Sequence, residues 1–95
     1  MYQVHTLKAV RKDLKKLSKD VAVKIVNCRL PKLSGNPYSG ALLSGKFSKY
    51  WKYSFSYKGT SYRIIYQISK QEKVVLIIAI GSREKFYEKL FNRLK

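Results

Sequence analysis

A continuous run of seven apolar residues, from Val74 to Ile80, constrains the fold of this chain most strongly. The run is far shorter than the ~20 apolar residues that a transmembrane helix needs. A strand with one face in water alternates polar and apolar side chains, whereas this run is apolar at every position. It therefore predicts a central β-strand that is buried on both faces and ends at Gly81.

The two segments before this strand alternate with a period of two, which is typical of β-strands. Residues 50–57 and 60–68 each place one set of bulky apolar and aromatic side chains on a single face. These sets are Trp51, Tyr53, Phe55 and Tyr57 in the first segment and Tyr62, Ile64, Tyr66 and Ile68 in the second. Short turns join the segments, so the sequence predicts a three-stranded antiparallel meander.

The N-terminal third predicts a short strand at residues 2–5 and then two antiparallel helices. The first helix carries an apolar stripe at helical spacing, made of Leu7, Val10, Leu14, Leu17 and Val21. The second helix is expected to end before Pro31, because a proline inside a helix removes a hydrogen bond. Residues 31–46 are expected to form a loop, and residues 83–94 predict a C-terminal helix.

These elements give an α+β fold class with the order β-α-α-β-β-β-α: an N-terminal strand, a two-helix hairpin, the meander and a C-terminal helix. At 95 residues the chain has room for one core, so we expect a single domain over residues 1–95. The helical hairpin is expected to cover one face of the sheet, with Cys28 as a small core residue.

The charge is strongly unbalanced, with 21 Lys and Arg against 5 Asp and Glu and a formal net charge of +16. Self-repulsion on this scale opposes the compact state, which indicates a polyanionic partner. Six cations around the first helix, opposed there by Asp13 alone, predict a docking surface for RNA. They are Lys8, Arg11, Lys12, Lys15, Lys16 and Lys19.

The chain has one cysteine and one histidine, which excludes two further classes of protein. Cys28 alone cannot supply a disulfide framework, and Cys28 with His5 cannot fill the four positions of a zinc shell. We therefore expect no metal and no other cofactor. The N-terminus lacks the pattern of a secretory signal peptide, so we expect a cytoplasmic protein.

No P-loop, nucleophile elbow, zinc-protease or dinucleotide-binding motif is present. The five acids are expected to be exposed, four of them on helices and one in a turn. They are Asp13, Asp20, Glu72, Glu84 and Glu88. An enzymatic site would therefore be built from cations and tyrosine, and the candidates are Lys52, Arg63, Arg83 and Tyr87. Each also has a structural interpretation, as a solvated lysine, an ion-paired arginine or a core tyrosine.

Alternation along the last strand places Arg83 on the odd-numbered face, with Val75, Ile77 and Ala79. Tyr87 follows Arg83 by one helical turn and would share its side of the helix. Given a suitable register between the strands, the four candidates converge at one end of the sheet.

Two segments of the sequence resemble the RelE/ParE superfamily of bacterial and archaeal toxins. The first is Ser-Tyr-Arg-Ile-Ile-Tyr-Gln at residues 61–67, and the second runs from Val74 through Gly-Ser-Arg at residues 81–83 to Tyr87. Residues 42–45, Leu-Leu-Ser-Gly, resemble the family's Leu-x-Gly segment. The resemblance covers nearly the whole chain and implies the RelE-like fold.

The resemblance is closer to the RelE branch, whose members cut mRNA in the ribosomal A site, than to the ParE branch, which poisons DNA gyrase. Arg83 and Tyr87 match catalytic positions that ParE-like proteins generally lack. By the same motifs, Lys52 matches the first lysine of the family's Lys-x-Lys and Arg63 the arginine of Tyr-Arg. Ser54 stands at the second lysine and is expected to contact RNA.

The resemblance implies three partners: a cognate antitoxin, the ribosome and its mRNA. An acidic helical segment would complement the basic faces of the chain. The implied reaction is attack of an RNA 2′-OH on the adjacent phosphorus, with the arginines stabilising the phosphorane. Two alternatives stay open at this point, a gyrase poison of the ParE type and an RNA-binding module without catalysis.

Overall fold

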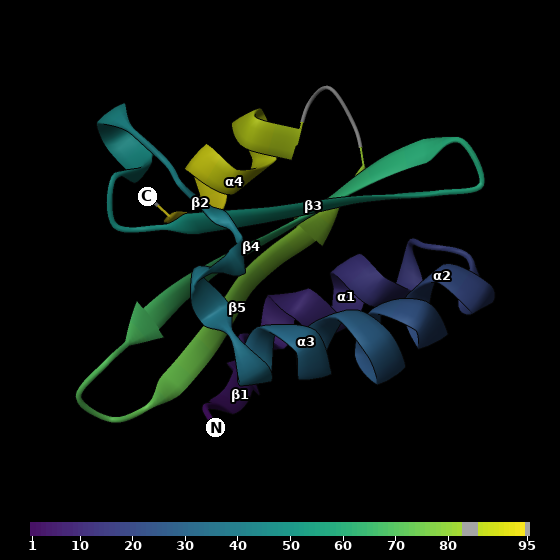
Figure 1. The fold of residues 1–95 in the computed structure, drawn as a ribbon. Coiled ribbons are helices and arrows are strands. Elements are labelled where there is room, and N and C mark those ends of the chain that lie inside the picture. The colour runs from purple at the N-terminus through teal and green to yellow at the C-terminus, as the bar shows by residue number, and fades with distance from the viewer. Residues whose placement is uncertain (83–85, 95) are drawn as a thin grey trace.

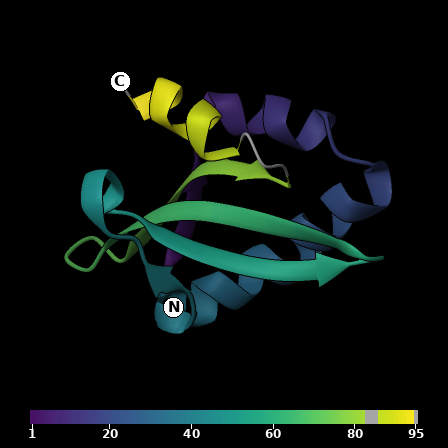
Figure 2. The same ribbon diagram turned by 90° about the horizontal axis from the view of Figure 1, so that it is seen from above.

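The computed structural model describes residues 1–82 and 86–94, which form a five-stranded sheet with helices on both sides (Figure 1; Figure 2). The strands are β1 (Gln3–Thr6), β2 (Ala41–Leu42), β3 (Trp51–Tyr57), β4 (Thr60–Ser69) and β5 (Val74–Gly81). Their order across the sheet is β1-β5-β4-β3-β2. The α+β fold class and the antiparallel meander β3-β4-β5 are confirmed.

The apolar strand β5 has a neighbour on each side, as its sequence predicts. It pairs in parallel with β1 and antiparallel with β4. Its interior is shielded from water along most of its length, since Val75, Ile77, Ile78, Ala79 and Ile80 are buried. The expectation of a central strand covered on both faces is therefore confirmed.

The predicted helical hairpin is present, but its second arm is longer than expected. The helices are α1 (Lys8–Lys15), α2 (Lys19–Lys24), α3 (Leu30–Gly35) and the C-terminal α4 (Phe86–Leu94). A π-helical turn, Ile25–Arg29, joins α2 directly to α3. The prediction that the helix ends before Pro31 is wrong, because Pro31 lies in the first turn of α3, where a missing N–H is tolerated.

The π-helical turn also explains a wrong prediction for Cys28, which is exposed rather than buried. A π turn contains more residues than an α turn, so it changes which side chains face inward. Ile25 and Leu33 are fully buried against the sheet, while Val26 and Cys28 between them point to solvent. No helix in the described ranges is long and apolar enough to cross a membrane.

Residues 31–46 are not a plain loop as predicted, because the sheet organises much of this segment. It contains most of α3, the 3-10 turn η2 (Pro37–Ser39), β2 and the start of η3 (Gly45–Phe47). The buried Tyr66 hydroxyl donates a 2.6 Å hydrogen bond to the Pro37 carbonyl, and burial raises the pKa of Tyr66 to about 12. A Cβ at Gly40 would collide with the Lys52 carbonyl and the Tyr66 hydroxyl, so glycine permits this close approach.

Two hydrophobic cores lie on opposite faces of the sheet. The larger core joins the helical hairpin to the sheet and includes Val10, Val21, Ile25, Leu33, Phe55, Ile64, Tyr66, Val75 and Ile77. The smaller core lies under α4 and consists of Ile65, Ile78, Ala79, Phe86 and Leu90. Figure 2 shows α4 and α2–α3 on opposite sides of the strands. The predicted inward faces of β3 and β4 belong to the larger core.

A β-bulge in β5 changes which residues face α4. Ile65 pairs with Ala79 whereas Tyr66 pairs with Ile77, so Ile78 is an extra residue in β5. Val75 and Ile77 belong to the larger core, but Ala79 belongs to the core under α4. The prediction of one odd-numbered face along this strand is therefore wrong, because the bulge reverses the alternation after Ile78.

Candidate functional site

The strand register places Lys52, Ser54 and Arg63 on the sheet face that carries α4. Lys52 pairs with Ile65, and Arg63 pairs with Ser54 on one side and with Gly81 on the other. Directly opposed residues share a face, and so do residues two positions apart in one strand. Ile65 belongs to the core under α4, which fixes the side on which the set lies.

Tyr87, on the first turn of α4, meets Arg63 on this face. The Arg63 guanidinium lies 5.8 Å from the centre of the Tyr87 ring, a cation–π arrangement. Tyr87 also contacts the rings of Phe86 at 5.4 Å and Phe47 at 6.4 Å. The Tyr87 ring thus packs on aromatic side chains and also contacts Arg63 of the candidate site. Its interpretations as a core tyrosine and as a site residue therefore each describe part of its surroundings.

Gly81 has a role in this arrangement that the sequence did not reveal. A Cβ on Gly81 would collide with the ring of Phe86. The glycine therefore lets Phe86 pack directly on the end of β5, and Phe86 is buried there. Since Tyr87 is the next residue, this contact fixes the start of α4 beside Arg63, the pairing partner of Gly81. The signal available in the sequence was the Gly-to-Phe spacing after an apolar strand.

Arg83, the fourth predicted catalytic residue, lies outside the described residues. The other three share one face of the sheet with Ser54, and both Arg63 and Lys52 are partly exposed. In the described ranges, the carboxylates of Asp13, Asp20 and Glu72 bind side chains other than Lys52 and Arg63, and Glu88 is exposed on α4. Asp13 binds Arg93 and Lys89, Asp20 binds Lys58, and Glu72 bonds with Ser69. The arrangement therefore suits an oxyanion ligand, which guanidinium and ammonium groups bind.

The predicted RNA-docking cations form a surface separate from this site. They lie on α1, at its C-cap (Lys16) or at the start of α2, and all six are exposed: Lys8, Arg11, Lys12, Lys15, Lys16 and Lys19. The helix α1 packs on β5, whereas Lys52 belongs to β3, and β4 lies between those two strands. The structure thus brings Lys52, Arg63 and Tyr87 to one face and leaves the six helix cations on another element.

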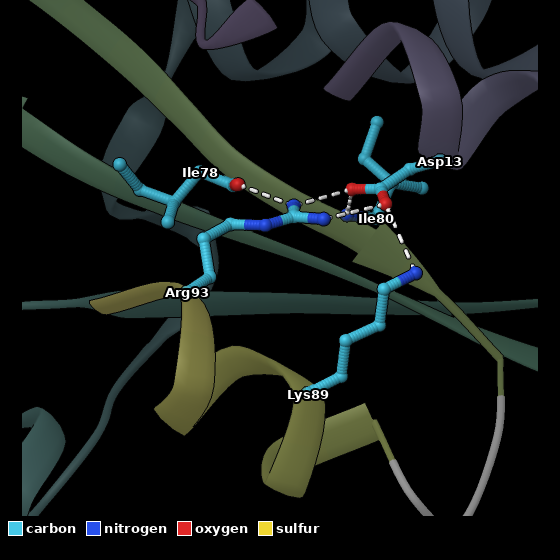
Figure 3. Close-up of polar contacts among 5 residues, drawn as sticks. All are labelled: Asp13, Ile78, Ile80, Lys89 and Arg93. Carbon is cyan, nitrogen blue, oxygen red and sulfur yellow. Dashed lines mark hydrogen bonds and ion pairs between the residues drawn. The ribbon is translucent and has the colours of Figure 1, made fainter. Parts of the chain in front are cut away.

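Asp13 is buried, which corrects the prediction that this acid is exposed. Its side chain is 1 % exposed and binds groups from two other elements (Figure 3). Arg93 donates two hydrogen bonds to it, at 2.7 and 2.9 Å, Lys89 donates one at 3.3 Å, and the Ile80 N–H donates one at 3.1 Å. Arg93 also donates to the Ile78 carbonyl at 3.0 Å. The cluster fastens α4 to both α1 and β5.

The charged partners decide the protonation state of this buried acid. Burial alone raises the pKa of Asp13, but hydrogen bonds from Arg93, the Ile80 N–H and Lys89, together with the charge of Arg93, outweigh it and lower the pKa. The same contact with Asp13 raises the pKa of Arg93. Helical spacing could have found the buried acid, since Asp13 lies three residues after Val10 and four before Leu17, on the buried stripe.

Comparison with known proteins relates this chain to toxins. Residues 4–91 match the family of ParE-like toxins of type II bacterial toxin-antitoxin systems. The toxin of the Mycobacterium tuberculosis RelBE2 toxin-antitoxin complex is similar at 26% identity and a TM-score of 0.74, over 86% of this chain and 91% of that chain.

Two Escherichia coli structures are similar in fold. The intact RelBE complex matches at 23% identity and a TM-score of 0.70, over 88% of this chain and 99% of that chain. An arginine-substituted variant of the free RelE toxin matches at 21% identity and a TM-score of 0.73, over 99% and 98%. No curated protein sequence matches the chain.

The family match covers most of the chain, and the similar structures include both isolated toxins and toxins bound to antitoxins. The fold and the motifs at residues 61–67 and 74–87 agree with these findings. The chain belongs to the ParE-like toxins of type II toxin-antitoxin systems, within the RelE/ParE superfamily and near its RelE branch.

Proposed function

We propose that this toxin is a ribosome-dependent endoribonuclease that cuts mRNA in the A site and thereby inhibits translation. The observation that carries the proposal is the contact of the Arg63 guanidinium with the Tyr87 ring, on the face that also bears Lys52 and Ser54. An arginine held beside a partly exposed aromatic ring suits a nucleotide, since the cation binds phosphate and the ring stacks on a base.

The chemistry is intramolecular cleavage of the RNA strand. The 2′-oxygen attacks the adjacent phosphorus, the bond from phosphorus to the 5′-oxygen breaks, and the products are a cyclic phosphate and a free 5′-OH. Arg63 and Arg83 stabilise the charge of the phosphorane. Lys52 acts as a further cation, or its unprotonated amine accepts the 2′-OH proton, and a proton from solvent completes the 5′-OH. Tyr87 positions the nucleotide. Ser54 contacts the RNA as a neutral donor at the position of the family's second lysine.

The partners follow from the same proposal. The ribosome supplies the mRNA and a large anionic surface, which the exposed cations of α1 would bind through ribosomal RNA. The cognate antitoxin would supply an acidic, helical segment that complements the net charge of +16. Similar toxins from M. tuberculosis and E. coli occur in complexes with antitoxins. A ribosome-bound function places the active toxin in the cytoplasm.

Purified ribosomes programmed with a defined mRNA test the proposal directly, with the cut mapped by primer extension. We expect a cut in the A-site codon and a loss of about 100–1,000-fold in rate for Arg63→Ala and for Arg83→Ala. Lys70→Ala, in the exposed turn between β4 and β5, is the control and should cut at the wild-type rate. Intact mRNA with the wild-type toxin, or equal cutting by the arginine variants, contradicts the proposal.

The match to a ParE-like family favours a second candidate, poisoning of DNA gyrase. This candidate predicts gyrase-linked DNA breaks and intact mRNA in cells that express the toxin. A gyrase cleavage assay beside the ribosome assay separates the two. Binding of RNA without any cut and without toxicity would instead indicate a plain RNA-binding module.

A further inference from the structure

A cavity of about 260 Å³ lies where α1, the end of β5 and α4 meet. Its walls combine apolar surface with charged groups from two helices. The lining residues are Asp13, Lys16, Leu17, Ile80, Gly81, Ser82, Phe86 and Lys89. The cavity is large enough to hold a phosphate group. Lys16 and Lys89 are both exposed, so the cavity is accessible from solvent.

Lys16 and Lys89 contribute two ammonium groups to the lining of this cavity. Contact with the Lys89 amine is the largest influence on Lys16, and together with its charge it lowers the pKa of Lys16. Like charges repel, so two converging ammonium groups are stabilised by an anion between them. Among the described residues, no carboxylate lies within ion-pair distance of Lys16.

The nearby carboxylate of Asp13 does not supply that anion. Both of its oxygens accept hydrogen bonds from Arg93, and the Ile80 N–H takes a further position. The single negative charge of Asp13 is shared by Arg93 and Lys89, and with Lys16 beside the same cavity the positive charges there are in excess. Lys89 is 3.3 Å from one Asp13 oxygen and is 46 % exposed, so its remaining donors can reach a second partner.

We propose that the Lys16–Lys89 pair and this cavity bind one phosphate group of a single-stranded RNA whose neighbouring nucleotide lies at Arg63 and Tyr87. The inference rests on the proposed nuclease function. Two contacts connect the cavity to the site: Gly81 lines the cavity and pairs with Arg63, and Phe86 lines it and touches Tyr87. A strand with a phosphate at every nucleotide can occupy both places at once.

The same contacts favour RNA over an acidic peptide as the occupant. Phosphates along a strand repeat at fixed spacing, so binding at Arg63 holds the next phosphate near the end of β5. A peptide carboxylate can also bind Arg63, but a nucleotide supplies both a phosphate for Arg63 and a base that stacks on Tyr87. Lys16 also belongs to the basic surface of α1, which makes the cavity a bridge between that surface and the site.

The first test measures binding of a fluorescent 2′-O-methylated RNA, which lacks the attacking hydroxyl and cannot be cut. Affinity is measured by anisotropy over a range of salt concentrations for wild type, Lys16→Gln, Lys16→Arg and Lys70→Gln. Lys16→Gln should weaken binding several-fold and reduce the salt slope by about 0.7, the value for one phosphate contact on a single strand. Lys16→Arg should retain the slope, and Lys70→Gln should match wild type.

The second test locates the bound anion with inorganic phosphate as the probe. Titration should shift the amide NMR signals of Gly81 and Ser82 in the wild-type protein, and Lys16→Gln should abolish the shifts. Lys89→Gln should do the same while Arg93 still binds Asp13, so the fold is retained. Absence of these shifts in wild type, or their persistence in both variants, contradicts the inference.

Two further outcomes separate this inference from the nuclease proposal. If ribosome-dependent cutting occurs but Lys16→Gln leaves the RNA salt slope unchanged, the phosphate site is wrong and the nuclease stands. If the slope falls but the ribosome assay shows no cut, the site stands as an RNA contact of a toxin with another activity. If Lys16→Gln weakens an acidic peptide and not RNA, the cavity belongs to the antitoxin and our assignment is wrong.

Discussion

The two ends of α4 use the same residue types in opposite ways. At its C-terminal end, Arg93 binds Asp13, a buried carboxylate from α1 that Lys89, nearer the middle of the helix, also contacts. At its N-terminal end, Tyr87 lies against Arg63, for which residues 1–82 and 86–94 supply no acidic partner. The difference shows that a cation in this chain becomes structural where one of the scarce acids holds it in a buried position, as Asp13 holds Arg93. Cations that keep exposed donors, such as Lys89, stay available for a ligand.

The largest loss of stability is expected from Asp13→Ala, which removes the carboxylate that holds the C-terminal end of α4. Arg93 is 16 % exposed at its side chain and would be left as an unpaired, largely buried charge. Removing one partner of such a pair costs about 3–5 kcal/mol. Urea unfolding followed by circular dichroism measures the change, with Asp20→Ala as the matched surface control. A loss below about 1 kcal/mol would mean that the cluster does not anchor α4.

Arg63→Lys is expected to separate activity from stability at the other end. Lysine keeps the charge but loses the planar fork that matches phosphate oxygens. Cutting in the ribosome assay should fall by about 100-fold, in line with the loss of one electrostatic group. The unfolding free energy should change by less than about 1 kcal/mol, the size of an exposed cation–π contact. A large loss of stability with normal cutting would reverse the roles of the two ends.

Low pH should selectively weaken the contact between Asp13 and the C-terminal end of α4. The pKa of Asp13 is lowered in the folded protein, so its carboxylate contributes stability that is fully present above the ordinary value of 3.8. That contribution is lost as pH falls from 3.8 toward the lower folded value. Wild type should therefore lose more stability than Asp13→Asn over this interval. Parallel pH dependence of the two proteins, measured by thermal melting, would exclude Asp13 as the group responsible.

The smallest effect is expected at Asp20, which pairs with Lys58 at 3.1 Å on the surface. Hydrogen bonds from Ser18 and Lys58 lower the pKa of Asp20 to about 2, but the group is exposed and salt screens it. Asp20→Asn should leave the melting temperature close to that of wild type at physiological salt. A shift as large as that of Asp13→Asn would show that burial is not what distinguishes the two acids.

Local sequence patterns were sufficient to predict the strands of the sheet, but they did not predict the β-bulge in β5 or the π-helical turn. The period-two segments and the apolar run predicted β3, β4 and β5 because alternation reports directly on which faces are buried. The bulge at Ile78 left no such signal, since every neighbouring residue in β5 is apolar. The prediction at Pro31 was wrong because the effect of a proline depends on the turn that precedes it. That turn is π-helical here, and local sequence does not indicate a π-helical turn.

The site was predicted in part for a similar reason. Motif resemblance selected Lys52, Arg63 and Tyr87, and the register brings them to one face. Helical spacing places Asp13 on the buried stripe, but its burial was missed because a carboxylate there needs charged partners, and Arg93 lies about 80 positions away in the sequence. The role of Gly81 was missed because the residue acts through the absence of a side chain, which leaves room for the Phe86 ring.

The bulge in β5 also determines how the chain tolerates changes in length. One added residue places Ile78 and Ala79 on the same face of the strand, opposite Ile65, while Gly81 pairs with Arg63 on the face of α4. Deleting Ile78 would close the bulge and restore regular alternation, with Ala79 still opposite Ile65 and Gly81 still opposite Arg63. The loss would fall on the attachment of α4, because Ile78 packs under that helix and its carbonyl accepts a hydrogen bond from Arg93. The inserted residue thus adds a contact for α4, and the pairing of the strands determines which face of this toxin carries its candidate site.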